Sequence, residues 1–179
     1  MTGQFLKKLL CTAMLSLTCM AASAISAYAE VPASVEIAEE ELIMQACMEE
    51  QNRTREEEEF RQSIADYALS FLGGRYVDAG NDPHTGVDCS GFVKYVLEHA
   101  AGITLNRCSR DQAKQGETVT ADEMRPGDLL FYEKNGRINH VAMYIGEGQV
   151  VHASTYKTGI KTSQWNYRTP VVIKNMLGD

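Results

Sequence analysis

The sequence predicts an α+β domain in which helices come first and antiparallel strands follow. Apolar residues recur at helical spacing between residues 61 and 101, and from residue 129 onward they form short runs bounded by turn-forming residues. Cys89 stands at the start of the second predicted helix, whereas His140 and His152 stand on predicted strands. We therefore expect helices packed on an antiparallel sheet that carries both histidines.

Residues 1–29 have the pattern of a secretory signal peptide. Lys7 and Lys8 form a basic start, residues 9–20 are apolar, and Ala27-Tyr28-Ala29 has the small residues of a cleavage site. The apolar run is short for a membrane span, so we expect export, cleavage and no stable span afterwards. Cleavage after residues 22–24, an uncleaved anchor and a lipoprotein through Cys19 are the alternatives.

The acidity of the chain is confined to one segment. Residues 30–60 hold eleven glutamates against Arg53 and Arg55, whereas residues 61–179 hold thirteen acidic and thirteen basic residues. We interpret 30–60 as an acidic helical linker, or alternatively as a propeptide-like segment, a spacer or an adaptor. Residues 61–179 suffice for one domain, and neither part has the basic charge that attracts nucleic acid. We expect a monomer.

The cysteine pattern argues against a disulfide-stapled fold and against a structural metal. Cys11 and Cys19 fall in the signal segment, which leaves Cys47, Cys89 and Cys108. An odd number leaves a free thiol or pairing between molecules. The sequence has no CxxC and no zinc-type Cys/His spacing, so we expect no metal and no cofactor.

Turn signals divide the domain into elements. One helix runs to a stop at Gly73-Gly74, and a turn-rich loop covers residues 76–87. A second helix covers 90–101 with Gly102 as its C-cap, and a short helix over 110–115 has Ser109 as a candidate N-cap. The predicted strands are 129–132, 138–145, 149–154 and 169–174.

The hairpin formed by the predicted strands 138–145 and 149–154 decides whether the histidines can cooperate. A three-residue turn at 146–148 makes cross-strand partners sum to 294, so that Ala142 lies opposite His152 and His140 opposite Ser154. Both histidines then share a face, and Val141, Met143, Ile145 and Val151 form the other, buried face. A two-residue turn would separate the histidines.

Cys89 at the start of a helix is predicted to favour the thiolate, because unpaired backbone N–H groups attract negative charge there. An imidazole nearby can accept the thiol proton, and a second polar group can fix the tautomer of that imidazole. The alternative is a small buried cysteine with no chemical role.

Four segments carry a resemblance to a known family: Asp88-Cys89-Ser90-Gly91-Phe92-Val93, Arg125-Pro126-Gly127-Asp128-Leu129, residues 140–146 and His152-Ala153-Ser154. In this order they resemble the NlpC family of bacterial cell-wall cysteine peptidases, over about residues 61–177. The resemblance implies a papain-like α+β fold in a secreted or cell-wall-associated enzyme. It also implies hydrolysis in the peptidoglycan stem peptide, often between γ-D-glutamyl and a diamino acid.

The resemblance also implies residue roles. Cys89 matches the nucleophile, His140 the general base, and His152 the residue that orients it. Tyr76 matches a tyrosine that helps to stabilise the oxyanion, with an aromatic lid as the alternative role. Four further residues are expected to shape the entrance for the stem peptide: Asp88, Ser90, Ser109 and Arg110.

The sequence departs from the family pattern in three places. Val77-Asp78-Ala79-Gly80 replaces a usual Trp-Gly-Gly run, Asn139 precedes the first histidine, and Cys108 stands where threonine is common. These changes leave the substrate subtype open. An amidase, an acyltransferase, a transglutaminase-like enzyme and a non-catalytic wall-binding module are the alternative functions.

Overall fold

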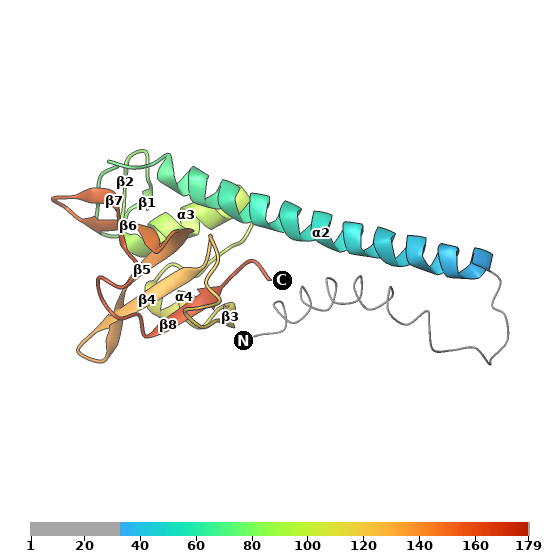
Figure 1. Ribbon diagram of the computed structural model, residues 1–179. Coiled ribbons are helices and arrows are strands. Elements are labelled where there is room, and N and C mark those ends of the chain that lie inside the picture. Colours follow the sequence, from blue (N-terminus) through green and yellow to red (C-terminus); the bar gives the residue numbers. More distant parts are fainter. Residues whose placement is uncertain (1–32, 179) are drawn as a thin grey trace. The chain divides into compact units, whose positions relative to one another are not determined.

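The computed structural model describes residues 33–178 of the 179-residue chain, with side chains from residue 41 onward. The chain divides into two compact units, residues 1–56 and 57–179. Helix α2 (Ala33–Leu69) supplies all the described residues of the first unit (Figure 1). The predicted signal segment, residues 1–29, lies outside the described residues.

Helix α2 changes in character near Arg61. Most side chains from 41 to 60 are exposed, including Leu42 at 68% and Met48 at 58%, because this stretch has no continuous apolar stripe. Ile64 and Ala68, one turn apart, are fully buried in the core of the second unit. The predicted stop is confirmed, since the helix ends at Leu69 and a turn leads to Gly73 at φ +81°.

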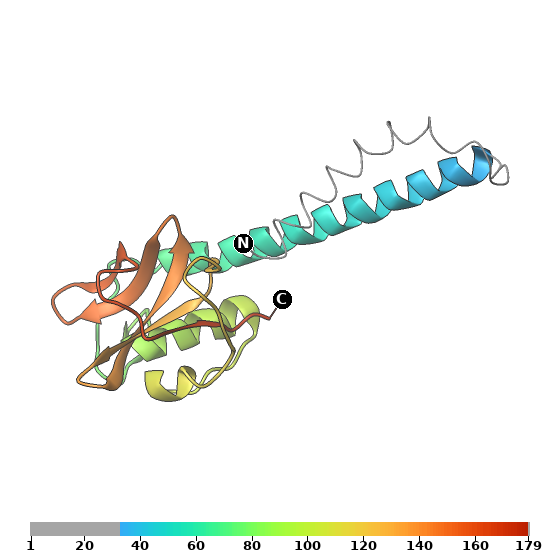
Figure 2. The same cartoon turned by 60° about the horizontal axis from the view of Figure 1, so that its bottom comes forward.

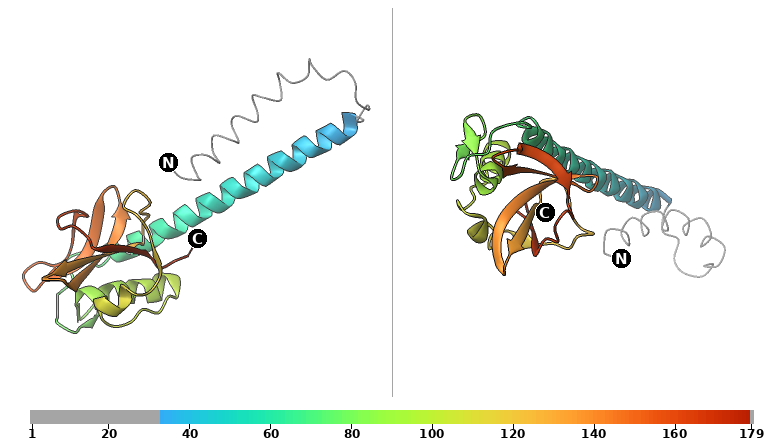
Figure 3. Two further views of the ribbon diagram at one scale, coloured as in Figure 1. Left: turned by 90° about the horizontal axis from the view of Figure 1, so that it is seen from below. Right: turned by 90° about the vertical axis from the view of Figure 1, so that its left-hand side faces the viewer.

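The second unit is an α+β domain, as predicted. Its six-stranded antiparallel sheet has the order β3-β8-β4-β5-β6-β7 and is strongly twisted (Figure 3). Helices α3 (Cys89–Ala101) and α4 (Ser109–Gln112) contact β5, and Figure 2 shows them on the same side of the sheet. The strands are β3 (Glu117–Thr118), β4 (Leu129–Lys134), β5 (Arg137–Gly146), β6 (Gln149–Thr155), β7 (Gly159–Gln164) and β8 (Val172–Asn175).

Both faces of the sheet are buried, which corrects the expectation of one buried face. On the face toward α3, the predicted residues Val141, Met143 and Val151 are fully buried with Phe92 and others, and Ile145 is partly buried. The opposite face has its own cluster, formed by Leu130, Tyr132, Ala142, Val150 and Ile173. The histidines therefore lie on a covered face.

The turn between β5 and β6 differs from the prediction, although the register is the predicted one. Gly146 pairs with Gln149 across a two-residue turn, and the register shifts between Tyr144 and Gly146. Met143 pairs with Val151 and Tyr144 with Val150, which restores the sum of 294. The extra residue at the bulge compensates for the shorter turn, so both histidines keep the same face.

Several local predictions need correction. Helix α3 begins at Cys89, one residue early, and Gly102 is confirmed as its left-handed C-cap at φ +68°. Ser109 is the first residue of α4 and not its N-cap, which is Cys108 without a side-chain hydrogen bond. Strands β3 and β7 and the pair β1 (Asn81–Asp82) and β2 (Gly86–Val87) were not predicted from the sequence, and the last strand is shorter than predicted.

A buried arginine ties α2 to the sheet region. Arg61 is 1% exposed, and its Nη1 donates to Asp128 Oδ1 at 3.2 Å and to the carbonyl oxygen of Pro126 at 3.2 Å. Its Nη2 donates to Asn175 Oδ1 at 3.0 Å. Burial raises the pKa of Asp128, so the carboxylate depends on the backbone N–H of Arg125, which donates to Oδ2 at 2.9 Å, and on the Arg61 guanidinium to remain charged.

Replacement of Arg61 by alanine is expected to lower the free energy of unfolding by about 3–5 kcal/mol, because it leaves a buried carboxylate without its partner. Urea unfolding followed by circular dichroism measures this loss. Arg137→Ala removes an exposed arginine and is the matched control, with an expected change below about 0.5 kcal/mol. Equal stability of the two variants would contradict the structural role of Arg61.

Candidate active site

Cys89 is held by the cap of helix α3. Asp88 has an extended backbone, and its Oδ1 accepts hydrogen bonds from the Gly91 backbone N–H at 2.8 Å and from the Ser90 hydroxyl at 3.1 Å. A Cβ at Gly91 would overlap the carbonyl oxygen of Gly80, so the glycine permits the close approach of the preceding loop. The local sequence therefore fixes the position of the cysteine on the first turn.

Arg107 completes this cap from outside the helix. Its Nη2 donates to Asp88 Oδ2 at 2.7 Å and to the Gly80 carbonyl at 3.0 Å, while its Nη1 donates to Asp88 Oδ1 and Ser90 Oγ, both at 3.0 Å. Burial opposes ionisation of Asp88, but the bonds from Arg107, Gly91 and Ser90 outweigh it and lower the pKa of that carboxyl. Arg107 was not predicted from the sequence, since a partner nineteen residues away leaves no local signal.

The environment of the Cys89 thiol differs from the prediction. Burial raises the pKa of Cys89, and the nearby Asp88 carboxylate raises it further. The backbone amides of Val141, Ser90 and Cys89 itself act in the opposite direction without reversing the shift. The predicted bias toward thiolate is therefore wrong for the free protein. The contribution from the Val141 amide also shows that the sulfur lies beside β5. Val141 is the residue that follows His140 in the chain.

The two predicted histidines are in direct contact. His140 Nε2 and His152 Nδ1 are 2.7 Å apart, and His152 Nε2 is 3.0 Å from the hydroxyl oxygen of Ser163 on β7. Both histidines are buried, at 9% and 2% exposure. A chain of polar groups thus crosses three adjacent strands, β5, β6 and β7.

This histidine pair is held in its neutral form. Burial lowers the pKa of His140 to about 3, with further lowering by His152 and Arg168. Burial lowers the pKa of His152 to about 4, and Lys161 adds to the shift. A neutral imidazole has one free lone pair and can accept a proton, whereas an imidazolium cannot.

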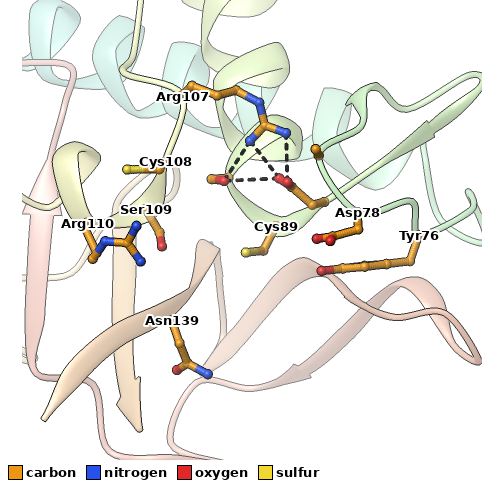
Figure 4. Close-up of a pocket in the computed structure, with 11 residues that line it drawn as sticks. Tyr76, Asp78, Cys89, Arg107, Cys108, Ser109, Arg110 and Asn139 are labelled. Atoms are coloured by element: carbon orange, nitrogen blue, oxygen red, sulfur yellow. Dashed lines mark hydrogen bonds and ion pairs between the residues drawn. The ribbon is translucent and has the colours of Figure 1, made fainter. Parts of the chain in front are cut away.

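Cys89 opens into a pocket of about 450 Å³ (Figure 4). Figure 4 shows Tyr76 and Asp78 on one side of Cys89, and Ser109 and Arg110 on the other. The pocket brings together the non-histidine residues predicted for the site and adds five more; its full lining is Tyr76, Asp78, Ala79, Asp88, Cys89, Ser90, Arg107, Cys108, Ser109, Arg110 and Asn139.

Tyr76 presents a protonated hydroxyl to this pocket. Burial raises its pKa to about 12, and the neighbouring Cys89, Asp88, Asp78 and Tyr156 contribute in the same direction. Its ring packs edge-on against Tyr156 at 4.9 Å between centroids. The side chain thus has both a hydrogen-bond donor and an aromatic contact, which are the two roles considered from the sequence.

Within residues 33–178, no cluster of three or more His, Cys, Asp or Glu side chains is arranged to hold a metal ion. In the same described part of the chain, no helix has the length and apolar character needed to cross a membrane.

A cysteine on the first turn of a helix, packed on an antiparallel sheet that carries a histidine pair, places the domain in the papain-like α+β fold class. The sequence profile of the NlpC/P60 family matches residues 73–177, more than half of the chain. The protein therefore belongs to the NlpC/P60 family.

Two curated relatives show where the similarity lies. The chain is 38% identical over 112 residues to the gamma-DL-glutamyl hydrolase of Bacillus subtilis, an alignment that covers 58% of this chain and 27% of that protein. It is 32% identical over 123 residues to the murein DD-endopeptidase MepS/murein LD-carboxypeptidase of Escherichia coli, and this alignment covers 69% of this chain and 64% of that protein. The chain thus spans less than two thirds of the length of these relatives.

Solved structures agree with the fold. The NlpC/p60 domain of the peptidoglycan hydrolase SagA superposes with a TM-score of 0.58 at 32% identity, over 63% of this chain and 96% of that domain. The peptidoglycan hydrolase RipB from Mycobacterium tuberculosis superposes with a TM-score of 0.55 at 26% identity, over 66% of this chain and 67% of that chain.

The histidine pair makes the stability of the domain depend on pH. Both folded pKa values lie below the ordinary value of 6.5, so below pH 6.5 the unfolded chain binds protons that the folded protein does not. The free energy of unfolding is expected to fall between pH 6.5 and about 4, by at most about 1.4 kcal/mol per pH unit for each histidine. His152→Asn should reduce this slope, as measured by urea unfolding at pH 7 and 4.5.

His84→Asn is the matched control, because His84 is exposed. The loss of unfolding free energy between pH 7 and 4.5 should be the same in this variant as in the unmodified protein. An equally large loss in His152→Asn would show that the histidine pair does not account for the acid sensitivity.

Proposed function

We propose that this protein is a secreted cysteine peptidase that hydrolyses peptide bonds in the stem of bacterial peptidoglycan. The observation that carries the proposal is the combination of the Cys89 sulfur, which lies beside β5, with the hydrogen-bonded pair of His140, on β5, and His152. Family membership and the names of the relatives, a glutamyl hydrolase and a murein endopeptidase, support the substrate class. The signal-like residues 1–29 support export.

The proposed reaction starts from a neutral thiol and a neutral imidazole. His140 Nδ1, the nitrogen not bonded to His152, takes the proton from Cys89 as the sulfur attacks the peptide carbonyl carbon. The same proton then passes to the leaving amine as the C–N bond breaks, which leaves a thioester on Cys89. Water attacks the thioester with His140 again as the base, and the acid is released while the thiol is restored.

The oxyanion of each tetrahedral intermediate needs donors that are already in place. We assign the backbone N–H of Cys89, at the unpaired start of α3, and the Tyr76 hydroxyl to this role. The raised pKa of Tyr76, about 12, supports its role as a donor at neutral pH.

The favoured bond joins γ-D-glutamyl to a diamino acid. A γ-linked glutamyl residue keeps a free α-carboxylate near the scissile carbonyl, and Arg110 is an exposed cation of the pocket lining. Asp88 and Ser90 already bond Arg107, so we propose that they shape the entrance together with Ser109. The two relatives act by name on different bonds, so the products must be identified directly.

Cys89→Ala is expected to abolish release of fragments from purified peptidoglycan, because it removes the proposed nucleophile. Mass spectrometry of the released fragments measures this loss and identifies the bond. Cys108→Ala removes the other thiol of the pocket lining, which is bonded to Asp111 at 3.0 Å, and is the matched control that should still release fragments. Full activity of Cys89→Ala would exclude the peptidase proposal.

His140→Ala should lower kcat by a factor of about 10³ or more, as expected when a general base is removed. The same fragment analysis measures this effect.

Tyr76→Phe separates the two roles of this residue. Loss of an oxyanion donor is expected to lower kcat by a factor of about 10² with little change in KM, because the bond forms only in the transition state. A phenylalanine retains the ring that packs on Tyr156. Unchanged kcat in steady-state cleavage of a stem peptide would leave Tyr76 as a packing residue only.

A further inference from the structure

The histidine pair requires an acceptor that the three proposed catalytic residues do not supply. For His140 Nδ1 to accept the Cys89 proton, His140 must carry its own proton on Nε2 and donate it to His152 Nδ1 across 2.7 Å. His152 then carries its proton on Nε2. Because this nitrogen is part of a residue only 2% exposed, a donor there needs a partner within the protein.

Ser163 is the partner that meets this need. Its Oγ lies 3.0 Å from His152 Nε2. Register places it on the correct face, because His152 is paired with Lys161 and Ser163 follows two residues later on β7. We propose that Ser163 is a positioning residue whose hydroxyl accepts a hydrogen bond from His152 Nε2–H and so holds the His152 ring with Nδ1 toward His140. This role rests on the proposed function of Cys89 and His140.

The surrounding groups show why a hydroxyl performs this task differently from a carboxylate. Tyr132 from β4 and Tyr167 after β7 pack on the pair at 6.0 and 5.4 Å between centroids, and Lys161 and Arg168 both disfavour imidazolium. A serine accepts a hydrogen bond without adding a negative charge. The His152 ring is therefore held in place while the pair remains neutral.

The reverse arrangement of protons would be inactive. If His152 carried its proton on Nδ1, it would donate to His140 Nε2, and His140 would then carry its proton on Nδ1. That nitrogen could no longer accept the Cys89 proton. The Ser163 hydroxyl bonds His152 Nε2 in either arrangement, because it accepts from N–H and donates to a bare nitrogen, so its role is to hold the His152 ring and not to choose the tautomer. Without this bond the ring is free to turn away from His140, and part of the population becomes inactive.

Steady-state cleavage of a soluble stem peptide tests the proposal. Ser163→Ala should lower kcat about tenfold with KM unchanged, because it removes one neutral hydrogen bond and no substrate contact. Ser163→Thr should recover most of the loss, because it restores the hydroxyl. Ser163→Asp should move the acid limb of the kcat/KM profile to higher pH, because a carboxylate stabilises the imidazolium. Thr162→Ala, an exposed neighbour on β7, is the matched control with unchanged kcat.

A kcat for Ser163→Ala equal to that of Thr162→Ala would overturn the proposal, as would a lower melting temperature with an unchanged kcat and pH profile. Nitrogen-15 NMR of the imidazole rings in the free protein gives a result that does not depend on activity. We expect Ser163→Ala to shift the His152 Nε2 resonance, because that nitrogen loses its hydrogen bond. An unchanged His152 resonance would reject the role of Ser163, whereas an active Cys89→Ala would reject the peptidase function instead.

Discussion

The antiparallel register of β5 and β6 is the constraint on which the site depends. It places His140 and His152 on one face at hydrogen-bonding distance, 2.7 Å, although they are twelve residues apart in the chain. A shift by one residue would send one histidine into the core on the α3 face. The bulge between Tyr144 and Gly146 and the two-residue turn must therefore be considered together, because only their combination gives this register.

The second determinant is the position of α3. The cap formed by Asp88 and the donors of Arg107 fix the first turn, and the buried face of the helix packs on the sheet through Phe92 and Val96. Cys89 is consequently held beside Val141 by two independent sets of contacts. Burial of this junction has an electrostatic effect as well, because it favours the neutral forms of both the thiol and the imidazoles. The proposed chemistry thus starts with proton transfer to a base and not from a preformed ion pair.

The features that sequence alone could predict are those with local or periodic signals. The helix stop, the C-cap Gly102, the strand alternation and the shared face of the histidines follow from spacing. Strand β7 was missed because Lys161, Thr162 and Ser163 give it little apolar alternation. The second buried face did have a signal, since the unbroken apolar run Leu129-Leu130-Phe131-Tyr132 is typical of a strand covered on both sides.

The contacts that determine protonation and hold the His152 ring could not be predicted in this way. Arg107 reaches Asp88 from nineteen residues away, and Ser163 reaches His152 from a strand that the sequence did not reveal. The thiol pKa depends on burial, which opposes the helix-terminus effect and exceeds it here. Family resemblance supplied the candidate residues, whereas the structure supplied their partners and their charge states.

The most direct test of the account is the identity of the covalent intermediate. Incubation of the protein with a stem peptide, followed by an acid quench and intact-protein mass spectrometry, measures any acyl adduct and its position. The account predicts one adduct with the mass of the amino-terminal part of the cleaved peptide, bound to Cys89 and lost on further incubation. Turnover without an adduct on Cys89, or an adduct on Cys108 in its place, would contradict it.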